Sequence, residues 1–213
     1  QAAHILRNRF HCKDGVTIRI KKQIPVAAGL GGGSSDAAAV LRALNSIWRL
    51  GLSLSELAKI ALTIDSDVPY CIYNKLAHVT GHGEKIELLP PQPHYWAVIA
   101  KQKISVSTPQ ILRQINYEKL HHLNNEALLA SLKKEDWQEA TKYMGNVLEP
   151  LTMKFYPEIG RLKNKMKELG ADVAQMSGTG PTVFAICHTE SRAKRIQNSI
   201  RGFCRDVHVV TLL

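Results

Sequence analysis

Residues 25–37 read PVAAGLGGGSSDA, and this stretch says most about the fold and chemistry of the 213-residue chain. Glycine has no Cβ, so successive N–H groups can converge on an anion in backbone conformations that other residues avoid. Apolar residues then recur at helical spacing, at Ala37, Val40, Leu41, Leu44 and Trp48. The stretch therefore predicts a glycine loop that leads into a helix N-terminus, where unpaired N–H groups and the helix dipole favour negative charge.

This loop differs from the two common phosphate-binding motifs. No Gly-Lys-Ser/Thr follows at the spacing of a Walker A loop, and the glycines do not form the dinucleotide fingerprint. We expect Ser34 or Ser35 to cap the helix. A glycine-rich entry that serves close packing alone is the structural alternative, but three consecutive glycines cost chain entropy that packing seldom offsets.

Composition is that of a folded protein, with 45% hydrophobic residues. No apolar run is long enough to span a membrane, so we expect no membrane partner. The four cysteines have neither the spacing of a zinc site nor the density of a disulfide scaffold. They predict buried, reduced thiols and a cytoplasmic protein.

The formal net charge of +10 allows two interpretations. One is a nucleic-acid-binding protein. However, aromatic residues make up only 6% of the chain and do not alternate with the basic residues, as single-strand binders require. We favour a generally basic surface that suits anionic small molecules.

The first half of the chain predicts mainly helices around the glycine loop. Helices are expected at about 1–11, at 36–49 and from Ser53 or Ser55 to about 64, and a strand at 16–22. The segments 77–80 and 85–89 flank Gly81-His82-Gly83 and predict a hairpin. A prolyl stretch at 89–93, LPPQP, then marks the boundary between two domains, at 1–92 and 93–213.

The second half predicts a small sheet covered by helices. Strands are expected at 96–100, 172–176, 182–187 and 207–212, and helices at 108–116, 124–131, 135–146, 156–169 and 190–201. This order is that of a split βαβ, or ferredoxin-like, unit. The fold class predicted for the whole chain is therefore α+β with two domains.

Three short motifs could carry chemistry, and each has a structural alternative. Asp67, before Val68-Pro69, could act as a general base, or could cap a helix that has Pro69 in its first turn. Thr108 could donate to a phosphate, or simply cap a helix that begins at Pro109. Residues 177–181, SGTGP, could be an ordinary turn between strands, or a second backbone packed against the phosphate loop.

Together, four motifs resemble the GHMP kinase superfamily, whose small-molecule kinases bind ATP with a glycine-serine loop instead of a Walker motif. They are IPVAAGLGGGSSDAAA at 24–39, Asp67-Val68-Pro69, Gly81-His82-Gly83-Glu84 and MSGTGPT at 176–182. The likeness runs along the whole chain. It is strongest to the branch of the non-mevalonate isoprenoid pathway, which phosphorylates the 2-hydroxyl of a cytidine diphosphate sugar-alcohol.

The resemblance implies a two-domain GHMP kinase fold with a ferredoxin-like C-terminal domain, and a requirement for ATP and Mg²⁺. It implies that Asp67 is catalytic and that the substrate lies at Thr108, Ser177, Gly178, Thr179 and Gly180. The residues implied to hold ATP form one continuous loop: Pro25, Val26, Ala27, Ala28, Gly29, Leu30, Gly31, Gly32, Gly33, Ser34 and Ser35. It assigns no Mg²⁺ ligand. We expect a monomer or weak homodimer that binds no nucleic acid.

Two other functions are kept as alternatives. One is another GHMP kinase, of the mevalonate or homoserine type, and the other is a non-catalytic, basic nucleic-acid-binding protein. Gln1 is not an initiator, and residues 3–10 have the pattern of the middle of a helix. The resemblance places the family's first motif, with a catalytic lysine, upstream of these residues. We therefore expect this chain alone to be inactive.

Overall fold

The structure is a computed structural model that describes residues 1–204 and 206–212. The chain divides into two compact units. The first comprises Gln1–Ile24 and Gly31–Pro91, and the second comprises Pro25–Leu30 and Gln92–Leu213. The first part of the glycine loop thus groups with the second unit. The rest of that unit begins only after the prolyl stretch, some 60 residues further along the chain.

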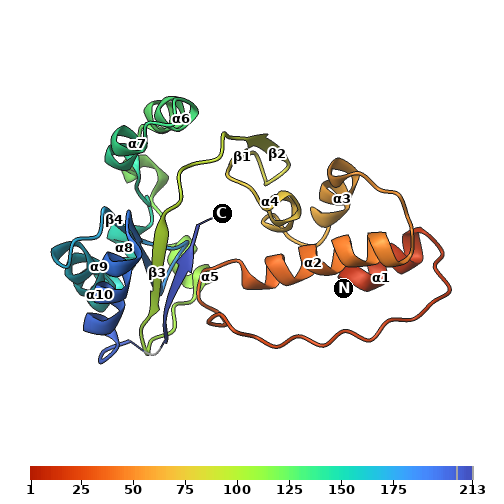
Figure 1. Ribbon diagram of the computed structural model, residues 1–213, viewed down its shortest axis with the longest axis horizontal. Coiled ribbons are helices and arrows are strands. Elements are labelled where there is room, and N and C mark those ends of the chain that lie inside the picture. Colours follow the sequence, from red (N-terminus) through yellow and green to blue (C-terminus); the bar gives the residue numbers. More distant parts are fainter. Residues whose placement is uncertain (205, 213) are drawn as a thin grey trace. The chain divides into compact units, whose positions relative to one another are not determined.

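The first unit is a helical cluster with one hairpin (Figure 1). Its elements are α1 (Ala2–Arg9), α2 (Gly32–Ile47), α3 (Leu54–Ala61), α4 (Val68–Tyr73), β1 (Ala77–Thr80) and β2 (Lys85–Leu88). Apolar side chains that recur along α1 to α4 bury one face of each helix in a common core, which includes Leu6, Leu41, Leu57 and Ile72. The hairpin was predicted at these positions, and that prediction is confirmed.

Local chemistry explains where these helices begin. Ser53 and Glu56 form a capping box at the start of α3, because the Ser53 hydroxyl accepts from the Glu56 N–H at 3.2 Å and the Glu56 carboxylate accepts from the Ser53 N–H at 2.8 Å. Pro69 lies in the first turn of α4, where a missing N–H costs nothing. Residues 70–73 continue this helix to its end.

The predicted strand at 16–22 is wrong. Val16, Ile18 and Ile20 alternate with polar residues as a strand would, but they are 38%, 46% and 55% exposed. Neither sheet in the described part of the chain includes this segment. Alternation specifies which side chains share a face, but a strand also needs a neighbouring backbone to pair with.

The second unit is built on a four-stranded antiparallel sheet in the order β4-β5-β3-β6. Its strands are β3 (Trp96–Lys101), β4 (Val173–Met176), β5 (Thr182–Cys187) and β6 (Asp206–Thr211). Its helices are α5 (Thr108–Arg113), η1 (Tyr117–Lys119, a 3₁₀ turn), α6 (Asn125–Lys133), α7 (Trp137–Tyr143), α8 (Glu149–Phe155), α9 (Pro157–Glu168) and α10 (Glu190–Ile200). This is the predicted ferredoxin-like arrangement, and the α+β fold class is confirmed.

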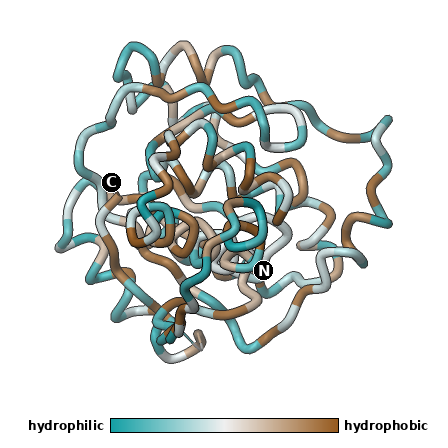
Figure 2. Tube along the Cα trace, turned by 90° about the vertical axis from the view of Figure 1, so that its right-hand side faces the viewer, coloured by the Kyte–Doolittle hydropathy of each residue, from teal (hydrophilic) through white to brown (hydrophobic). Residues whose placement is uncertain are grey.

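Helices α9 and α10 cover one face of the sheet (Figure 1). Their apolar residues, among them Ile159, Leu162 and Ile196, pack with Val98 and Val183 of the central strands in a single core. Figure 2 shows apolar and polar stretches following each other at short intervals along the helices, as expected when a helix buries one face. Sequence reasoning missed α8, although Pro150 marks its first turn.

The core of the second unit gives a stability prediction. Leu162 is 3% exposed, whereas Leu112 is 46% exposed. Replacing Leu162 with Ala should lower the free energy of unfolding by about 2–5 kcal/mol, because it removes buried methyl groups and leaves a cavity. Leu112→Ala should change it by about 0.5 kcal/mol or less, because most surface substitutions have small effects. Urea denaturation of the two variants measures the difference, and equal losses would contradict the packing described here.

Candidate active site

The start of α2 offers unpaired backbone donors. The first helical hydrogen bond runs from the Ser35 N–H to the Gly31 carbonyl, at 2.9 Å. The N–H groups of Gly32, Gly33 and Ser34 therefore lie ahead of the first hydrogen bond within the helix. No acidic residue occupies the first turn, and the Asp36 carboxylate one turn further on is paired with Lys22. This helix start thus carries the predicted preference for an anion.

The expected cap by Ser34 or Ser35 is wrong. The helix begins earlier than predicted, at Gly32, because Gly31 takes the left-handed conformation at the N-cap, with φ of +61°. No side chain makes a capping hydrogen bond there. Both serines consequently lie inside the first turn of the helix. Their hydroxyls are not used to close it.

Gly29, in the Pro25–Leu30 loop (here called the 25–30 loop), packs closely against another backbone segment. A Cβ at Gly29 would lie 2.7 Å from the Ser177 carbonyl oxygen and 3.0 Å from the Gly180 carbonyl oxygen. The Ser177 hydroxyl donates to the Gly29 carbonyl at 2.7 Å. Residues 177–180, here called the 177–180 turn, are therefore packed backbone to backbone against the 25–30 loop. Of the two interpretations of this motif, the structure supports the packed second backbone.

A buried lysine also contacts the 25–30 loop. Lys101, the last residue of β3, is 8% exposed, and its Nζ donates to the Val26 carbonyl at 3.3 Å. A buried ammonium group is costly unless its protons are used. Sequence reasoning did not identify Lys101. The one sequence signal that could have identified Lys101 is its place as a charged residue at the end of the otherwise apolar strand β3.

Two of the predicted substrate residues are joined directly. The hydroxyl groups of Thr108 and Thr179 lie 2.7 Å apart, within hydrogen-bonding distance. Thr108 was also considered as a helix cap, and that interpretation is wrong, because Ser107 occupies the N-cap position and Thr108 is the first residue of α5. One hydroxyl must donate to the other, so the pair retains one proton for a further acceptor.

Asp67 stands at the N-cap position of α4 but does not cap it. Its side chain makes no capping hydrogen bond to the helix, and the residue is exposed. The Asp67 N–H is instead held by the Asp65 carboxylate, at 3.1 Å. The sequence left two roles open for Asp67, a helix cap and a general base. The hydrogen bond that a helix cap would make is absent. The carboxylate therefore remains available to a reacting group.

The β1–β2 turn supports the turn that carries Asp67. Gly83 packs so tightly on the Ser66 carbonyl that a Cβ could not be accommodated. The His82 N–H donates to the Glu84 carboxylate at 2.6 Å. Hydrogen bonds from the backbone N–H groups of Glu84 and His82 lower the pKa of the Glu84 carboxyl group. The G-x-G-E pattern thus encodes a tight turn and a close approach to Ser66.

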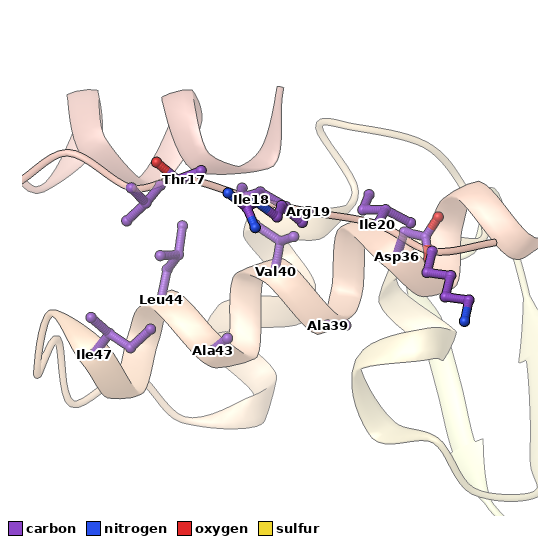
Figure 3. A pocket seen from close by; sticks show the side chains of 12 residues that line it. Thr17, Ile18, Arg19, Ile20, Asp36, Ala39, Val40, Ala43, Leu44 and Ile47 are labelled. Atoms are coloured by element: carbon purple, nitrogen blue, oxygen red, sulfur yellow. The ribbon is translucent and has the colours of Figure 1, made fainter.

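An apolar groove of about 600 Å³ lies between α2 and residues 16–21 (Figure 3). Figure 3 shows Ile18 and Ile20 on one side, and Val40, Leu44 and Ile47 of α2 on the other. Ile47 is 66% exposed, although it continues the apolar stripe of the helix. The groove lining is mainly aliphatic and includes only a few polar or charged groups, so the groove differs in character from the anion-binding start of α2.

Residues 1–204 and 206–212 contain neither a cluster of metal ligands nor a membrane-spanning helix. In that part of the chain, no group of three or more His, Cys, Asp or Glu side chains is placed to hold a metal ion. None of its helices is both long and apolar enough to span a bilayer. Two of the four thiols, Cys187 and Cys204, are buried, and burial raises the pKa of each to about 11. Cys12 and Cys71 are only partly buried, so the expectation of burial fails for them.

Family models match both units of the chain. Residues 1–75 match the GHMP kinases N terminal domain, and residues 128–206 match the GHMP kinases C terminal model. Both are models of kinase domains, and together they cover more than half of the chain, which places it among the small-molecule kinases. The chain belongs to the GHMP kinase family.

Relatives and solved structures agree with this family. A 4-diphosphocytidyl-2-C-methyl-D-erythritol kinase of Limosilactobacillus reuteri is 98% identical over all of this chain, which covers 75% of that relative. A protein of the same name from Levilactobacillus brevis is 58% identical over 99% of this chain and 74% of its own length. A crystal structure of 4-(cytidine 5'-diphospho)-2C-methyl-D-erythritol kinase superposes with a TM-score of 0.84 at 31% identity, over 99% of this chain and 75% of that one.

The close approach at Gly29 can be tested by adding one methyl group. Gly29→Ala must pay for a left-handed alanine, about 1–2 kcal/mol. It must also displace the backbone of the 177–180 turn, which should cost a further ~1–3 kcal/mol. Gly178→Ala is the matched control, because its φ is +55° but its Cβ would meet nothing closer than 3.6 Å. Chemical denaturation should rank Gly29→Ala as the less stable variant, and the reverse order would refute the contact.

Proposed function

We propose that this chain, when joined to the remaining part of its Limosilactobacillus reuteri relative, catalyses ATP-dependent phosphorylation of the 2-hydroxyl of 4-diphosphocytidyl-2-C-methyl-D-erythritol, a step of non-mevalonate isoprenoid precursor biosynthesis. The relatives with this name align with the whole chain, one at 98% identity. Among the structural observations, the start of α2 carries the proposal furthest. It combines unpaired N–H groups with an acid-free first turn, the arrangement that suits a polyphosphate.

ATP is assigned to the glycine loop and the helix start that follows it. The N–H groups of Gly32, Gly33 and Ser34 are available to phosphate oxygens, and the helix dipole favours the negative charge. We assign the rest of the phosphate contact to the other residues of the loop, 25–31 and Ser35. Phosphoryl transfer depends chiefly on such positioning and charge stabilisation.

Asp67 is assigned the role of general base. Its carboxylate makes no capping bond, and the residue is exposed at the start of α4. A carboxylate that is not used by its own helix can accept a proton from a substrate hydroxyl as that oxygen attacks the γ-phosphorus. The hydrogen bond from its own N–H to Asp65 holds the backbone of this residue in place.

Thr108 and the 177–180 turn are assigned to the substrate. The paired hydroxyls of Thr108 and Thr179 retain one proton that can be donated to a phosphate oxygen. Gly178 is assigned through its backbone N–H, because its carbonyl already accepts from the Asn146 amide at 2.7 Å. The hydroxyl of Ser177 is already committed to Gly29, which gives Ser177 a part in shaping the turn.

Mg²⁺ is proposed as a companion of ATP. It usually binds through substrate phosphates with one or two carboxylates and several waters, and therefore needs no cage of protein ligands. When bound, it offsets the charge of the transferring phosphoryl group. We further propose a cytoplasmic monomer or weak homodimer that binds neither nucleic acid nor a membrane.

Replacing Asp67 with Asn tests the assignment of the base. The variant removes the proton acceptor but keeps the size of the side chain, so phosphoryl transfer should fall by about 10²–10⁴-fold. ATP binding should change little, because the phosphate contacts are assigned elsewhere. We would measure transfer from radiolabelled ATP by this chain joined to the part of the Limosilactobacillus reuteri sequence outside the match.

Asp65→Asn is the matched control for this experiment. It removes one negative charge from the same turn, while its amide oxygen can still accept from the Asp67 N–H. Its transfer rate should stay within about tenfold of the unsubstituted protein. If Asp67→Asn turns over as fast as Asp65→Asn, Asp67 is not the base.

The identity of the substrate has its own test. The same protein should phosphorylate 4-diphosphocytidyl-2-C-methyl-D-erythritol with a kcat/KM at least ~10²-fold above that for mevalonate or homoserine, because the missing nucleotide leaves polar groups of the site unpaired. Cytidine diphosphate should compete with the preferred substrate. Efficient phosphorylation of mevalonate or homoserine, without such competition, would assign the chain to another branch of the family.

A further inference from the structure

Glu149 is a buried acid that none of the assigned roles uses. It is the first residue of α8 and is 7% exposed. One carboxylate oxygen, Oε1, accepts from the Met176 N–H at 2.6 Å, and the other, Oε2, pairs with the Lys163 ammonium. Burying a carboxylate is costly unless it is paired and hydrogen-bonded. Both oxygens are used here, so the arrangement is a specific one.

The partner of Glu149 is the Met176 N–H, a backbone donor that is not paired within the sheet. Met176 ends β4, which has only β5 as a neighbour in the sheet. An edge strand directs alternate N–H groups away from its neighbour, and these need another acceptor when they are buried. Glu149 supplies that acceptor immediately before the 177–180 turn begins.

Asn146 holds the other side of the same backbone. Its side-chain amide donates to the Met176 carbonyl at 2.9 Å and to the Gly178 carbonyl at 2.7 Å. Its own oxygen accepts from the Leu148 N–H at 2.9 Å, which fixes the side chain at the start of α8. Residues 146–149 thus bind one donor and two acceptors of residues 176–178.

The backbone held in this way is the one that contacts the 25–30 loop. Ser177 donates to the Gly29 carbonyl, and the Ser177 and Gly180 carbonyls close over Gly29. Thr179 of the same turn is joined to Thr108. All of these residues belong to the second unit. A shift of Met176 would therefore be passed on to the loop assigned to ATP.

We propose that Glu149, fixed by Lys163 and assisted by Asn146, is a positioning residue that sets the 177–180 turn against the 25–30 loop for nucleotide binding. Its effect on turnover rests on the proposed kinase function. Its effect on the turn does not. The two can therefore be tested separately, by hydrogen exchange in this chain and by kinetics in the protein carrying the additional Limosilactobacillus reuteri sequence.

The first experiment measures amide hydrogen exchange of Ser177 and Gly180, whose N–H groups bond to the Thr182 and Ser177 carbonyls. Glu149→Ala should speed their exchange about tenfold, the factor expected for the loss of one hydrogen bond to a charged group. Glu149→Gln should restore it to within about threefold, because its amide oxygen can still accept from Met176. Ile196→Ala, on the buried face of α10, is the control for general destabilisation and should not accelerate these two amides selectively.

The second experiment separates KM from kcat. Glu149→Ala should raise the KM for ATP about tenfold, whereas Ile196→Ala should lower only the active fraction and leave that KM unchanged. Asn146→Ala is a second variant in case Glu149→Ala fails to fold, because Asn146 is only half-buried and its loss should disturb folding less. Asn146→Ala should also accelerate amide exchange at residues 177 and 180. An unchanged exchange rate in Asn146→Ala and Glu149→Ala, or a Glu149→Gln variant as damaged as Glu149→Ala, would overturn the proposal. If the variants show the expected amide exchange but the unsubstituted protein has no kinase activity, only the proposed function is overturned.

Discussion

The organisation of the second unit depends on a contact that only two bare backbones can make. Gly29 lies so close to the 177–180 turn that a single added carbon would meet two carbonyl oxygens. The contact joins segments almost 150 residues apart in the chain, and Ser177 closes it with a hydrogen bond. It explains why the 25–30 loop groups with the second unit although it lies between α1 and α2 of the first in the chain. The glycine at this position is thus required by packing as well as by any phosphate.

Charge is distributed so that the helix start stays open to an anion. The nearby Asp36 is paired with Lys22, which neutralises its carboxylate. Asp67 differs, because its exposed carboxylate has no capping role. The Asp67 side chain is therefore not taken up by its own helix, as the proposed role of a base requires.

Local sequence patterns predicted most elements but not their partners. The 3.6-residue repeat after the glycines located α2, and the glycines between two short apolar runs located the β1–β2 hairpin. The same reasoning failed at 16–22, because an alternating pattern cannot supply the neighbouring strand that it needs. It also misplaced the start of α2, since the left-handed Gly31 lets the helix begin before the serines.

By itself, the sequence determined the glycine loop, the helix after it, the strands and all α-helices of the second unit except α8, and the family. These depend on short-range spacing and on residue types that act within a few positions of one another. Only the tertiary structure decided that Gly29 meets the 177–180 turn and that Thr108 meets Thr179. Only it identified Lys101 and Glu149 as buried charges that hold this backbone. Such contacts join positions tens of residues apart, and folding alone brings their backbones within hydrogen-bonding distance.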